Sequence, residues 1–490
     1  MGHCDSRSCP VVGRRQSGYH ALMRWGRLGD RLHRAALLLA VSMAVVGGLA
    51  IAALTWWLLW LGFGATAEQP NRLDLTKIAL AVAAGVGGAV ALAVAYRRQR
   101  DLERGRFAEL FGAAARQLGD ADVAVRIAGV YAMAGVADDF RAPNRRQQCV
   151  DVLCGYLRLP YDPVAGANHL VSQAETVDES GLKVERVYQF RQNDREVRRT
   201  IVKVIADHLR RSAEISWSHC EFTFNRAVLE QGDFRDTVFA GRQTSFAGAL
   251  FTGRTTFENA VFAGPHVTFR DARFQDGPVL FERAQFGSAR GEKKGERAGY
   301  GTTFDGADFD CSVSFEHAVF LGPRAGFTGM RCTGARTSFQ DTKFQTEVTA
   351  FDRATLDGQH LTFTAAELSS ARITFAGTNF EASTVAFDET RIGAPARMRN
   401  RGTRETDFRR AEFHGTTTFA GTTFAGRAVD FTEGDFFGDI SFVGARFTAG
   451  EVRFDRPMAW VGIHFDWDDI PTRKPQNVKP NPWPPEPPDE

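Results

Sequence analysis

The sequence VTFRDARF (residues 267–274) is followed after a short gap by VLFERAQF (residues 279–286). Both fit the unit Val-x-Phe-x-x-Ala-x-Phe, and related units recur about every 12 residues between Trp217 and about Arg456. Later copies include VSFEHAVF (313–320), ITFAGTNF (373–380) and ISFVGARF (440–447). This region contains roughly 34 of the 40 Phe residues of the chain. The repeat therefore decides the fold of the second half of the protein.

A small residue precedes nearly every Phe of the repeat by two positions, and this separation puts both side chains on one face of an extended chain. Phe spacings of five to seven residues and frequent Gly argue against a helix. One unit cannot bury its own Phe, so the units must stack around a shared core. We expect parallel coils of ~22–24 residues, stacked ~4.8 Å apart, in a rod of about ten coils and ~50 Å. In this register Phe269, Phe274, Phe281 and Phe286 point inward beside Ala272 and Ala284, while Gln275 and Arg283 point outward.

The repeated units resemble the Phe-rich branch of the pentapeptide-repeat family. The resemblance covers about half the chain and implies a right-handed quadrilateral β-helix. Two segments interrupt the rhythm, and we expect both to leave the rod as loops: Gly287 to Thr303 and Gly393 to Thr406. Some family members mimic duplex DNA and occupy DNA gyrase, which requires strong negative potential. In this rod Asp and Glu are nearly matched by Arg and Lys, so the gyrase-mimic function is the remotest alternative.

Two long apolar runs precede the repeat. Ala35 to about Gly64 carries no charge, and Leu75 to Tyr96 carries only Lys77. Each is long enough to cross a bilayer, which takes ~20 residues. We therefore predict a two-helix transmembrane hairpin. Arginines flank it at positions 24, 27, 31 and 34 and at positions 97, 98, 100, 104 and 106, so the positive-inside rule predicts both termini in the cytoplasm.

The stretch from Leu102 to about Ala213 has mostly helical periodicity. We expect Asp120 or Asp122 to cap a helix with Tyr131 on its buried face, and further helices over residues 145–159 and 185–213. Residues 164–182 are expected to form an exposed loop. The segments RIAGVYAMA (126–134), RQQCVDVLCGYLRLPY (146–161), VRRTI (197–201) and HLR (208–210) resemble parts of actinobacterial membrane proteins that carry pentapeptide repeats, and the resemblance implies HEAT-like helical hairpins.

The sequence predicts no catalytic, cofactor-binding or metal-binding residues. The sequence has no phosphate-binding Gly-rich loop and no paired-Cys metal spacing. His208, His219 and Cys220 are the nearest approach to a polar cluster, and His208 is expected to interact with the end of its helix. The seven Cys residues are scattered, which predicts reduced thiols, with Cys149 and Cys154 as packing residues. The net charge of +2 gives no reason to expect a nucleic-acid partner.

These features predict an α+β multi-domain protein without enzymatic activity, in the cell membrane as a multi-pass protein. The expected partners are the lipid bilayer, through residues 35–96, and a cytoplasmic protein bound by a scaffold or interaction module. The alternative is a membrane-linked signalling or defence effector whose repeat domain senses a partner.

After the rod, Trp460, Phe465 and Trp467 are expected to cap its open end, and Pro471 to Glu490 is expected to be an extended, solvated tail. The predicted domains are 1–34 (basic cytoplasmic segment), 35–96 (transmembrane hairpin), 97–215 (helical cytoplasmic domain), 216–457 (pentapeptide-repeat β-solenoid) and 458–490 (cap and Pro-rich tail).

Overall fold

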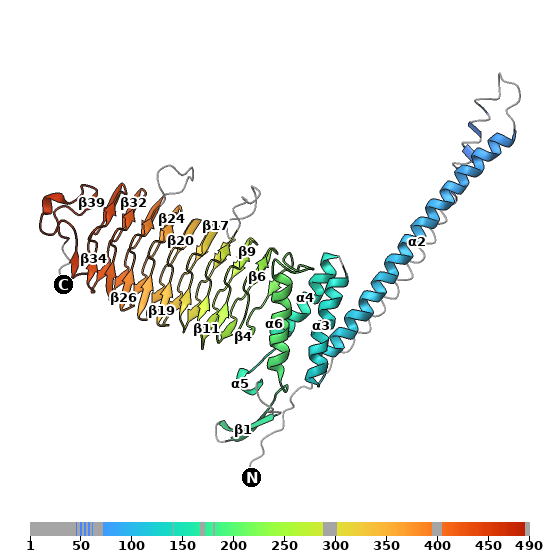
Figure 1. Cartoon of the computed structure of the whole chain (residues 1–490), viewed down its shortest axis with the longest axis horizontal. Coiled ribbons are helices and arrows are strands. Elements are labelled where there is room, and N and C mark those ends of the chain that lie inside the picture. Colours follow the sequence, from blue (N-terminus) through green and yellow to red (C-terminus); the bar gives the residue numbers. More distant parts are fainter. Residues whose placement is uncertain are drawn as a thin grey trace, which may run out of the picture. The chain divides into compact units, whose positions relative to one another are not determined.

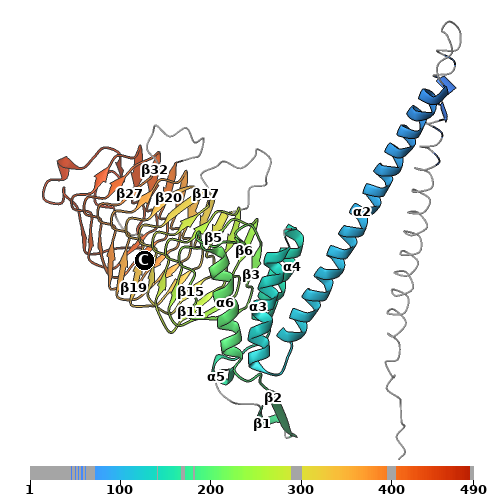
Figure 2. The same cartoon turned by 45° about the vertical axis from the view of Figure 1, so that its right-hand side comes forward.

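The computed structural model describes residues 46, 50, 53–54, 57–58, 61, 72–140, 142–166, 172–179, 182–287, 301–393 and 404–485. The chain divides into two compact units, Met1–Ala108 and Glu109–Glu490. The second unit contains a helical module and a long β-solenoid (Figures 1 and 2).

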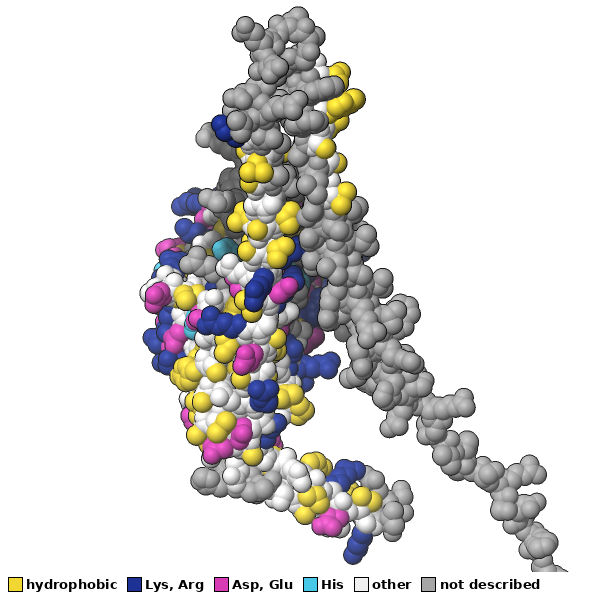
Figure 3. Space-filling view, turned by 90° about the vertical axis from the view of Figure 1, so that its right-hand side faces the viewer, with side chains coloured by type: hydrophobic (Ala, Val, Ile, Leu, Met, Phe, Trp, Pro, Cys, Tyr) yellow, Lys and Arg dark blue, Asp and Glu magenta, His cyan; other side chains and the backbone are white. Residues whose placement is uncertain are grey.

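Helix α2 (Arg72–Leu118) begins in the first unit and ends in the second. It is the one helix among the described residues that is long and apolar enough to cross a membrane. Apolar side chains lie at the surface of this helix (Figure 3). Leu80 and Leu92 are each 74% exposed. Most of the first predicted span, residues 35 to 64, lies outside the described residues, as does the basic segment 1–34. The described residues therefore contain one candidate span and do not support a multi-pass arrangement.

Three further helices form the helical module of the second unit: α3 (Val123–Asp139), α4 (Pro143–Leu157) and α6 (Asp194–Leu209). The predicted cap of α3 is confirmed, since the Asp122 carboxylate accepts a hydrogen bond from the Ala124 amide at 2.7 Å. Gly129 lets α3 approach the end of α2 closely, because a Cβ there would lie 2.6 Å from the Leu118 nitrogen. The expected inward position of Tyr131 is wrong, since this side chain is 55% exposed.

The segment between α4 and α6 differs from the expected loop and long helix. After the short helix α5 (Pro163–Gly166), strands β1 (Ser172–Glu179) and β2 (Leu182–Gln189) form an antiparallel hairpin. The predicted helix over residues 185–213 therefore begins only at Asp194. In LKVERVYQ, apolar and charged residues alternate only from Leu182 to Glu185, so the pattern of this strand is weak in the sequence.

The solenoid consists of short parallel strands in three sheets. The 10-stranded sheet contains β4 (Val228–Glu230), β7 (Leu250–Thr252), β11 (Arg273–Gln275), β15 (Asp308–Phe309), β18 (Arg331–Cys332), β21 (Thr355–Leu356), β25 (Asn379–Phe380), β29 (Glu412–Phe413), β33 (Asp435–Phe436) and β37 (Ala459–Trp460). The 9-stranded sheet contains β8 (Thr255–Thr256), β12 (Val279–Leu280), β16 (Val313–Ser314), β19 (Arg336–Ser338), β22 (His360–Thr362), β26 (Thr384–Ala386), β30 (Thr416–Thr418), β34 (Ile440–Ser441) and β38 (Ile463–His464).

The 18-stranded sheet contains two ladders, which the long strands β17 and β20 join. Its members are β3 (Phe222–Thr223), β5 (Val238–Phe239), β6 (Gln243–Ser245), β9 (Val261–Phe262), β10 (His266–Thr268), β13 (Gln285–Phe286), β14 (Gly301–Thr303), β17 (Val319–Gly326), β20 (Lys343–Ala350), β23 (Glu367–Leu368), β24 (Arg372–Thr374), β27 (Arg391–Ile392), β28 (Glu405–Asp407), β31 (Thr423–Phe424), β32 (Ala428–Asp430), β35 (Arg446–Phe447), β36 (Glu451–Arg453) and β39 (Val478–Lys479).

The Phe side chains form stacked columns inside the coils. Phe281 lies between Phe257 and Phe315, with ring centroids 5.0 and 4.8 Å away and interplanar angles of 4° on both sides. The spacing of the rings matches the spacing of paired strands, so each coil adds one ring to the column. Phe269, Phe274 and Phe286 are buried as well, as are Ala272 and Ala284. The predicted inward register is therefore confirmed.

The turns that follow these Phe residues share a left-handed backbone conformation that the repeat pattern does not predict. After Phe281, the Ala284 amide donates to the Phe281 carbonyl at 3.0 Å, and Arg283 has a φ of 54°. Asn259 occupies the equivalent turn of the preceding coil, with a φ of 56°, and Asp271 occupies the turn after Phe269 in the same coil as Arg283, with a φ of 53°. Positive φ costs a non-Gly residue on the order of 1 kcal/mol, and the stacked coils enforce it.

The two interruptions of the repeat are only partly loops. Val267 pairs with Thr302, and Ile373 pairs with Thr406, so the ends of both segments belong to strands β14 and β28. The remaining residues, 288–300 and 394–403, lie outside the described residues. The register of the solenoid is the same on both sides of each insertion.

The C-terminal segment also differs from the expected solvated tail. The 3-10 helix η1 (Pro471–Arg473) follows the last coil, and β39 pairs with β36. Trp483 packs against Phe465, with ring centroids 5.2 Å apart. As predicted, Phe465 and Trp467 are buried at this end, so the tail folds back over the last Phe layer.

Candidate functional site

The end of the rod nearest the helical module is closed by polar side chains. The Gln147 amide of α4 donates to the Glu221 carbonyl and accepts from the Glu221 amide, both at 2.8 Å. Arg158 donates to the Thr223 carbonyl at 2.8 Å. These contacts supply the hydrogen bonds that a preceding strand would make, so the first coil is capped rather than left as an open edge.

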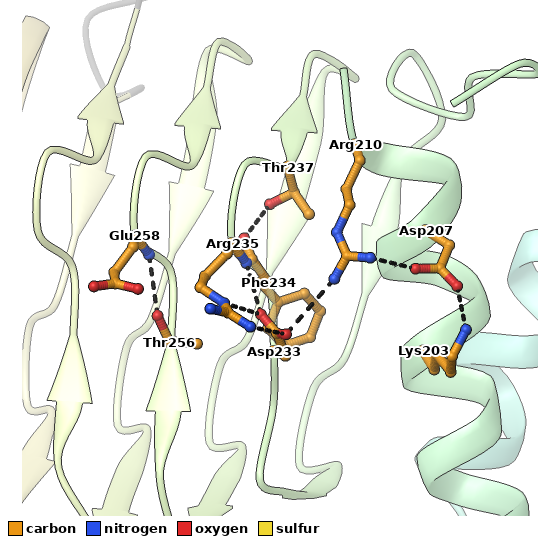
Figure 4. Close-up of polar contacts among 9 residues, drawn as sticks. All are labelled: Lys203, Asp207, Arg210, Asp233, Phe234, Arg235, Thr237, Thr256 and Glu258. Carbon is orange, nitrogen blue, oxygen red and sulfur yellow. Dashed lines mark hydrogen bonds and ion pairs between the residues drawn. The ribbon is translucent and has the colours of Figure 1, made fainter. Parts of the chain in front are cut away.

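A chain of ion pairs links α6 to the first coils (Figure 4). Asp207 accepts from Lys203 at 2.6 Å and from Arg210 at 2.5 Å. Arg210 continues to Asp233 at 3.6 Å, and Asp233 pairs with Arg235 at 2.9 Å. The hydrogen bond from Arg235 holds the pKa of Asp233 below its ordinary value, against the effect of burial. The chain is largely exposed, so we assign it a positioning role worth under about 1 kcal/mol per pair.

A buried cluster around Asp194 is the most distinctive polar feature of the helical module. Asp194 accepts from Arg126 at 3.2 Å, from Arg198 at 2.7 Å and from the Tyr156 hydroxyl at 2.5 Å. Arg126 is 1% exposed. Burial and the hydrogen bond to Asp194 raise the pKa of Tyr156, so its hydroxyl remains a donor. The three donors engage both oxygens of the Asp194 carboxylate, which is the arrangement of a structural cluster.

The cluster lies beside a cavity of about 290 Å³ that Tyr156, Tyr161 and Arg198 help to line. Arg198 is held on every side, because it also donates to the carbonyls of Leu157 and Leu159 at 2.9 Å each. Arg126 and Arg198 lie in the segments RIAGVYAMA and VRRTI, whose pattern alone does not predict a role for them. The available signal was an arginine on the apolar stripe of each helix, where a charge requires a buried partner.

The predicted interaction of His208 with its helix end is part of a larger contact. The His208 ring stacks on Trp217 at 4.0 Å, and its Nδ1 lies 2.6 Å from the Val204 carbonyl. Its Nε2 lies 3.1 Å from Asp138, which also accepts from the Trp217 indole at 2.8 Å. Burial alone lowers the pKa of His208, but the two hydrogen bonds outweigh it and the pKa is raised. The Cys220 amide donates to the Trp217 carbonyl at 2.8 Å, but among the described residues neither the His219 nor the Cys220 side chain contacts the His208 ring.

The cysteines of the described region are free thiols. Cys149 and Cys154 are buried on α4, as expected of packing residues. Burial raises the pKa of each to about 12, which keeps them protonated and poorly reactive. Among the described residues, no group of three or more His, Cys, Asp or Glu side chains is placed to hold a metal ion.

A groove of about 770 Å³ on the lateral surface of the rod gathers five arginines and three acidic residues. It lies over turns of the later coils, and the small residues Ala376 and Gly377 form part of its lining. The lining residues are Arg353, Ala376, Gly377, Arg409, Arg410, Asp430, Thr432, Glu433, Arg453, Asp455 and Arg456. Guanidinium groups in such numbers fit the recognition of oxyanions, so this groove is the candidate binding site of the rod.

Comparison of the chain with models of known protein families, with curated protein sequences and with solved structures gave no match. The function must therefore be inferred from the solenoid, the capped end and the groove themselves.

Proposed function

We propose that the protein is a membrane-anchored cytoplasmic scaffold without catalytic activity. In this proposal its rod is a right-handed quadrilateral β-helix of the pentapeptide-repeat type. The observation that carries the proposal is the unbroken strand register of the solenoid, from the pairing of Phe222 with Thr244 to that of Val452 with Val478. A stack of coils in constant register presents side chains at fixed spacing, which suits the binding of protein partners.

The lateral surface of the rod supports this role because it is polar and varied along its length. Each ladder places exposed side chains outward, for example Arg331, Lys343 and Thr384. Both ends of the rod carry caps, so the sides offer the larger area to a partner. Interfaces of standard size bury about 800 Å² per partner, which a few neighbouring coils of such a rod can supply.

The exposed apolar part of α2 supports the membrane anchor. Side chains such as Leu80 and Leu92 would be costly to leave in water, whereas a bilayer solvates them. The basic residues Arg97, Arg98 and Arg100 follow this part directly and favour the cytoplasmic side of a membrane. The helical module and the rod then face the cytoplasm.

Site-directed photo-crosslinking in intact cells tests the scaffold role. A photoreactive amino acid replaces one residue of the full chain at a time: Arg331, Lys343 or Thr384 on the strands, or Thr432 in the groove. We expect a discrete protein adduct from one position, or from two neighbouring positions, in the membrane fraction. Equal labelling from all four positions, or no adduct from any of them, would contradict a specific scaffold.

A second arm tests the anchor. Alkaline carbonate should leave the protein in the membrane pellet, whereas detergent should release it. Release by carbonate would rule out a spanning helix and leave α2 as a peripheral or soluble element.

A further inference from the structure

The lateral groove is built from one turn position repeated in five successive coils. Arg353, Gly377, Arg410, Glu433 and Arg456 all have positive φ, between 49° and 62°. The paired strands keep these turns in line, since Ala350 pairs with Thr374, Thr374 with Asp407, Asp407 with Asp430, and Asp430 with Arg453. Their side chains therefore follow one another along the rod axis. Four intervals of ~4.8 Å give the groove a length of about 19 Å.

At one end of the groove, the guanidinium groups outnumber the carboxylates that pair with them, so this end can bind an anion. Gly377 and the preceding Ala376 leave a gap between the turns that carry Arg353 and Arg410. The Arg353 amide donates to the Ala376 carbonyl at 3.0 Å, but among the described residues the Arg353 guanidinium has no hydrogen-bond or ion-pair partner. Arg410 uses its Nε for Glu433 at 2.8 Å, and the same Glu433 carboxylate also serves Arg456 at 3.0 Å. One carboxylate thus faces two guanidinium groups, while Arg353 faces none.

Arg409 adds little to this surplus, because both oxygens of Asp407 already accept from it, at 2.9 and 2.7 Å. The acidic lining residues Asp430 and Asp455 belong to later coils than Arg353 and Gly377. The Asp430 carboxylate accepts from the Thr432 amide at 2.9 Å, and among the described residues its second oxygen accepts no hydrogen bond. Arg409 and Arg453 lie within electrostatic range of it. The groove is therefore cationic over its first coils and of mixed charge over its last coils.

We propose that the groove binds an extended segment of a partner protein that carries a phosphorylated side chain at the Arg353–Arg410 end and a basic residue toward Asp430 and Asp455. A phosphate monoester carries nearly two negative charges and three acceptor oxygens, which match two guanidinium forks better than one carboxylate does. An extended chain advances about 3.3 Å per residue, so the groove accommodates about six residues. This inference rests on the proposed scaffold function and names the class of partner.

The test is fluorescence anisotropy with the full-length protein in detergent micelles. The probe is a labelled six-residue peptide with phosphoserine near one end and lysine near the other, prepared in both orders. We expect one order to bind, and binding to weaken at least tenfold without the phosphate. Arg353→Gly should weaken binding by a similar factor, and it should keep the fold because glycine favours the φ of 55° at this position.

Arg283→Gly is the matched control, since Arg283 is an exposed arginine at the same turn position in another column, with a φ of 54°. It should leave peptide affinity unchanged. The proposal is overturned if a folded Arg353→Gly variant binds the phosphopeptide as tightly as the unaltered protein, or if neither peptide order binds. It is also overturned if inorganic phosphate alone saturates the site and the peptide adds no affinity. A crosslinked partner at another ladder would then keep the scaffold role without this groove.

Discussion

At the first coil of the rod, Gln147 and Arg158 replace the missing strand with hydrogen bonds, whereas at the last coil Trp483 and Phe465 cover the exposed Phe layer with aromatic rings. A stack of parallel coils exposes two things at each end, unpaired backbone groups and the flat face of its core. The helical module mainly supplies hydrogen bonds to the unpaired backbone groups. The folded tail mainly covers the exposed face of the core. The difference suggests that the first end is fixed in orientation by directional bonds, while the second end is protected by burial.

We call the end of the rod that is hydrogen-bonded to the helical module the directional end. Its stability should be the more sensitive to a single substitution. Asp194→Ala removes the acceptor of two buried guanidinium groups, Arg126 and Arg198, and leaves their charge uncompensated. We expect a loss of ~3–5 kcal/mol in the stability of the helical module, measured by hydrogen exchange of α3, α4 and α6. Asp207→Ala, in the exposed chain of ion pairs, is the control and should cost under about 1 kcal/mol. Equal losses of stability in the two variants would mean that the buried cluster stabilises the helical module no more than the exposed ion pairs do.

The aromatic end should respond more locally. Trp483→Ala uncovers the last Phe layer and should cost about 2–4 kcal/mol, because the half-buried indole contacts several rings. Hydrogen exchange should accelerate in β36 to β39 and stay unchanged in the first coils, since coils contact mainly their neighbours. Trp483→Phe should restore most of the protection. Faster exchange along the whole rod would show instead that the two ends are coupled.

The interior of the rod was predictable from the sequence, and its ends were not. The separation of two residues between Ala272 and Phe274 fixes which side chains point inward, and this local rule needs no knowledge of distant residues. The closure by Trp483 depends on a contact with Phe465 across a proline-rich segment that, taken alone, favours an extended tail. The hairpin β1–β2 was missed because it lies on the surface and has no core of its own to impose a strong pattern.

The groove was hidden for a similar reason. Gly377 and Arg410 occupy the same turn position in successive coils, but the interruption of residues 393–406 separates them in the sequence. The sequence alone does not say how many residues of an insertion leave the rod, so the columns on its two sides cannot be aligned. The arginines could be counted from the sequence, but their convergence could not be predicted.

The directional end should also depend on pH. Both ring nitrogens of His208 face acceptors, the Val204 carbonyl and Asp138, so the protonated ring makes one hydrogen bond more than the neutral ring. Its folded pKa is raised above the unfolded value, so the contribution is complete below about pH 6.5 and is lost as the pH rises through the folded pKa. A hydrogen bond to a charged group contributes about 1.5–3 kcal/mol at most.

Thermal unfolding of the helical module, followed from pH 6 to pH 9, measures this effect. The stability of the unaltered protein should fall over this range, and that of His208→Gln should change less. The same slope in both proteins would assign the pH dependence to other groups.

The smallest expected effect concerns the coils between the two ends, which depend on their turns and on neither cap. Arg283 points outward as predicted, and this alone suggested that any substitution would be tolerated. Its φ of 54° makes the outcome depend on the residue type.

Arg283→Gly should change stability by less than about 1 kcal/mol, with a small gain where relief of backbone strain exceeds the added freedom of the unfolded chain. Arg283→Val should cost about 1–2 kcal/mol, because a β-branched residue is strained at positive φ. Phe281→Ala is the internal standard, at ~3–5 kcal/mol. Hydrogen exchange of β12 and β13 ranks the three variants. If Val is tolerated as well as Gly at position 283, the stacked coils do not enforce the left-handed backbone conformation of this turn residue. The difference between the ends and the interior of the rod must then be sought in the Phe columns alone.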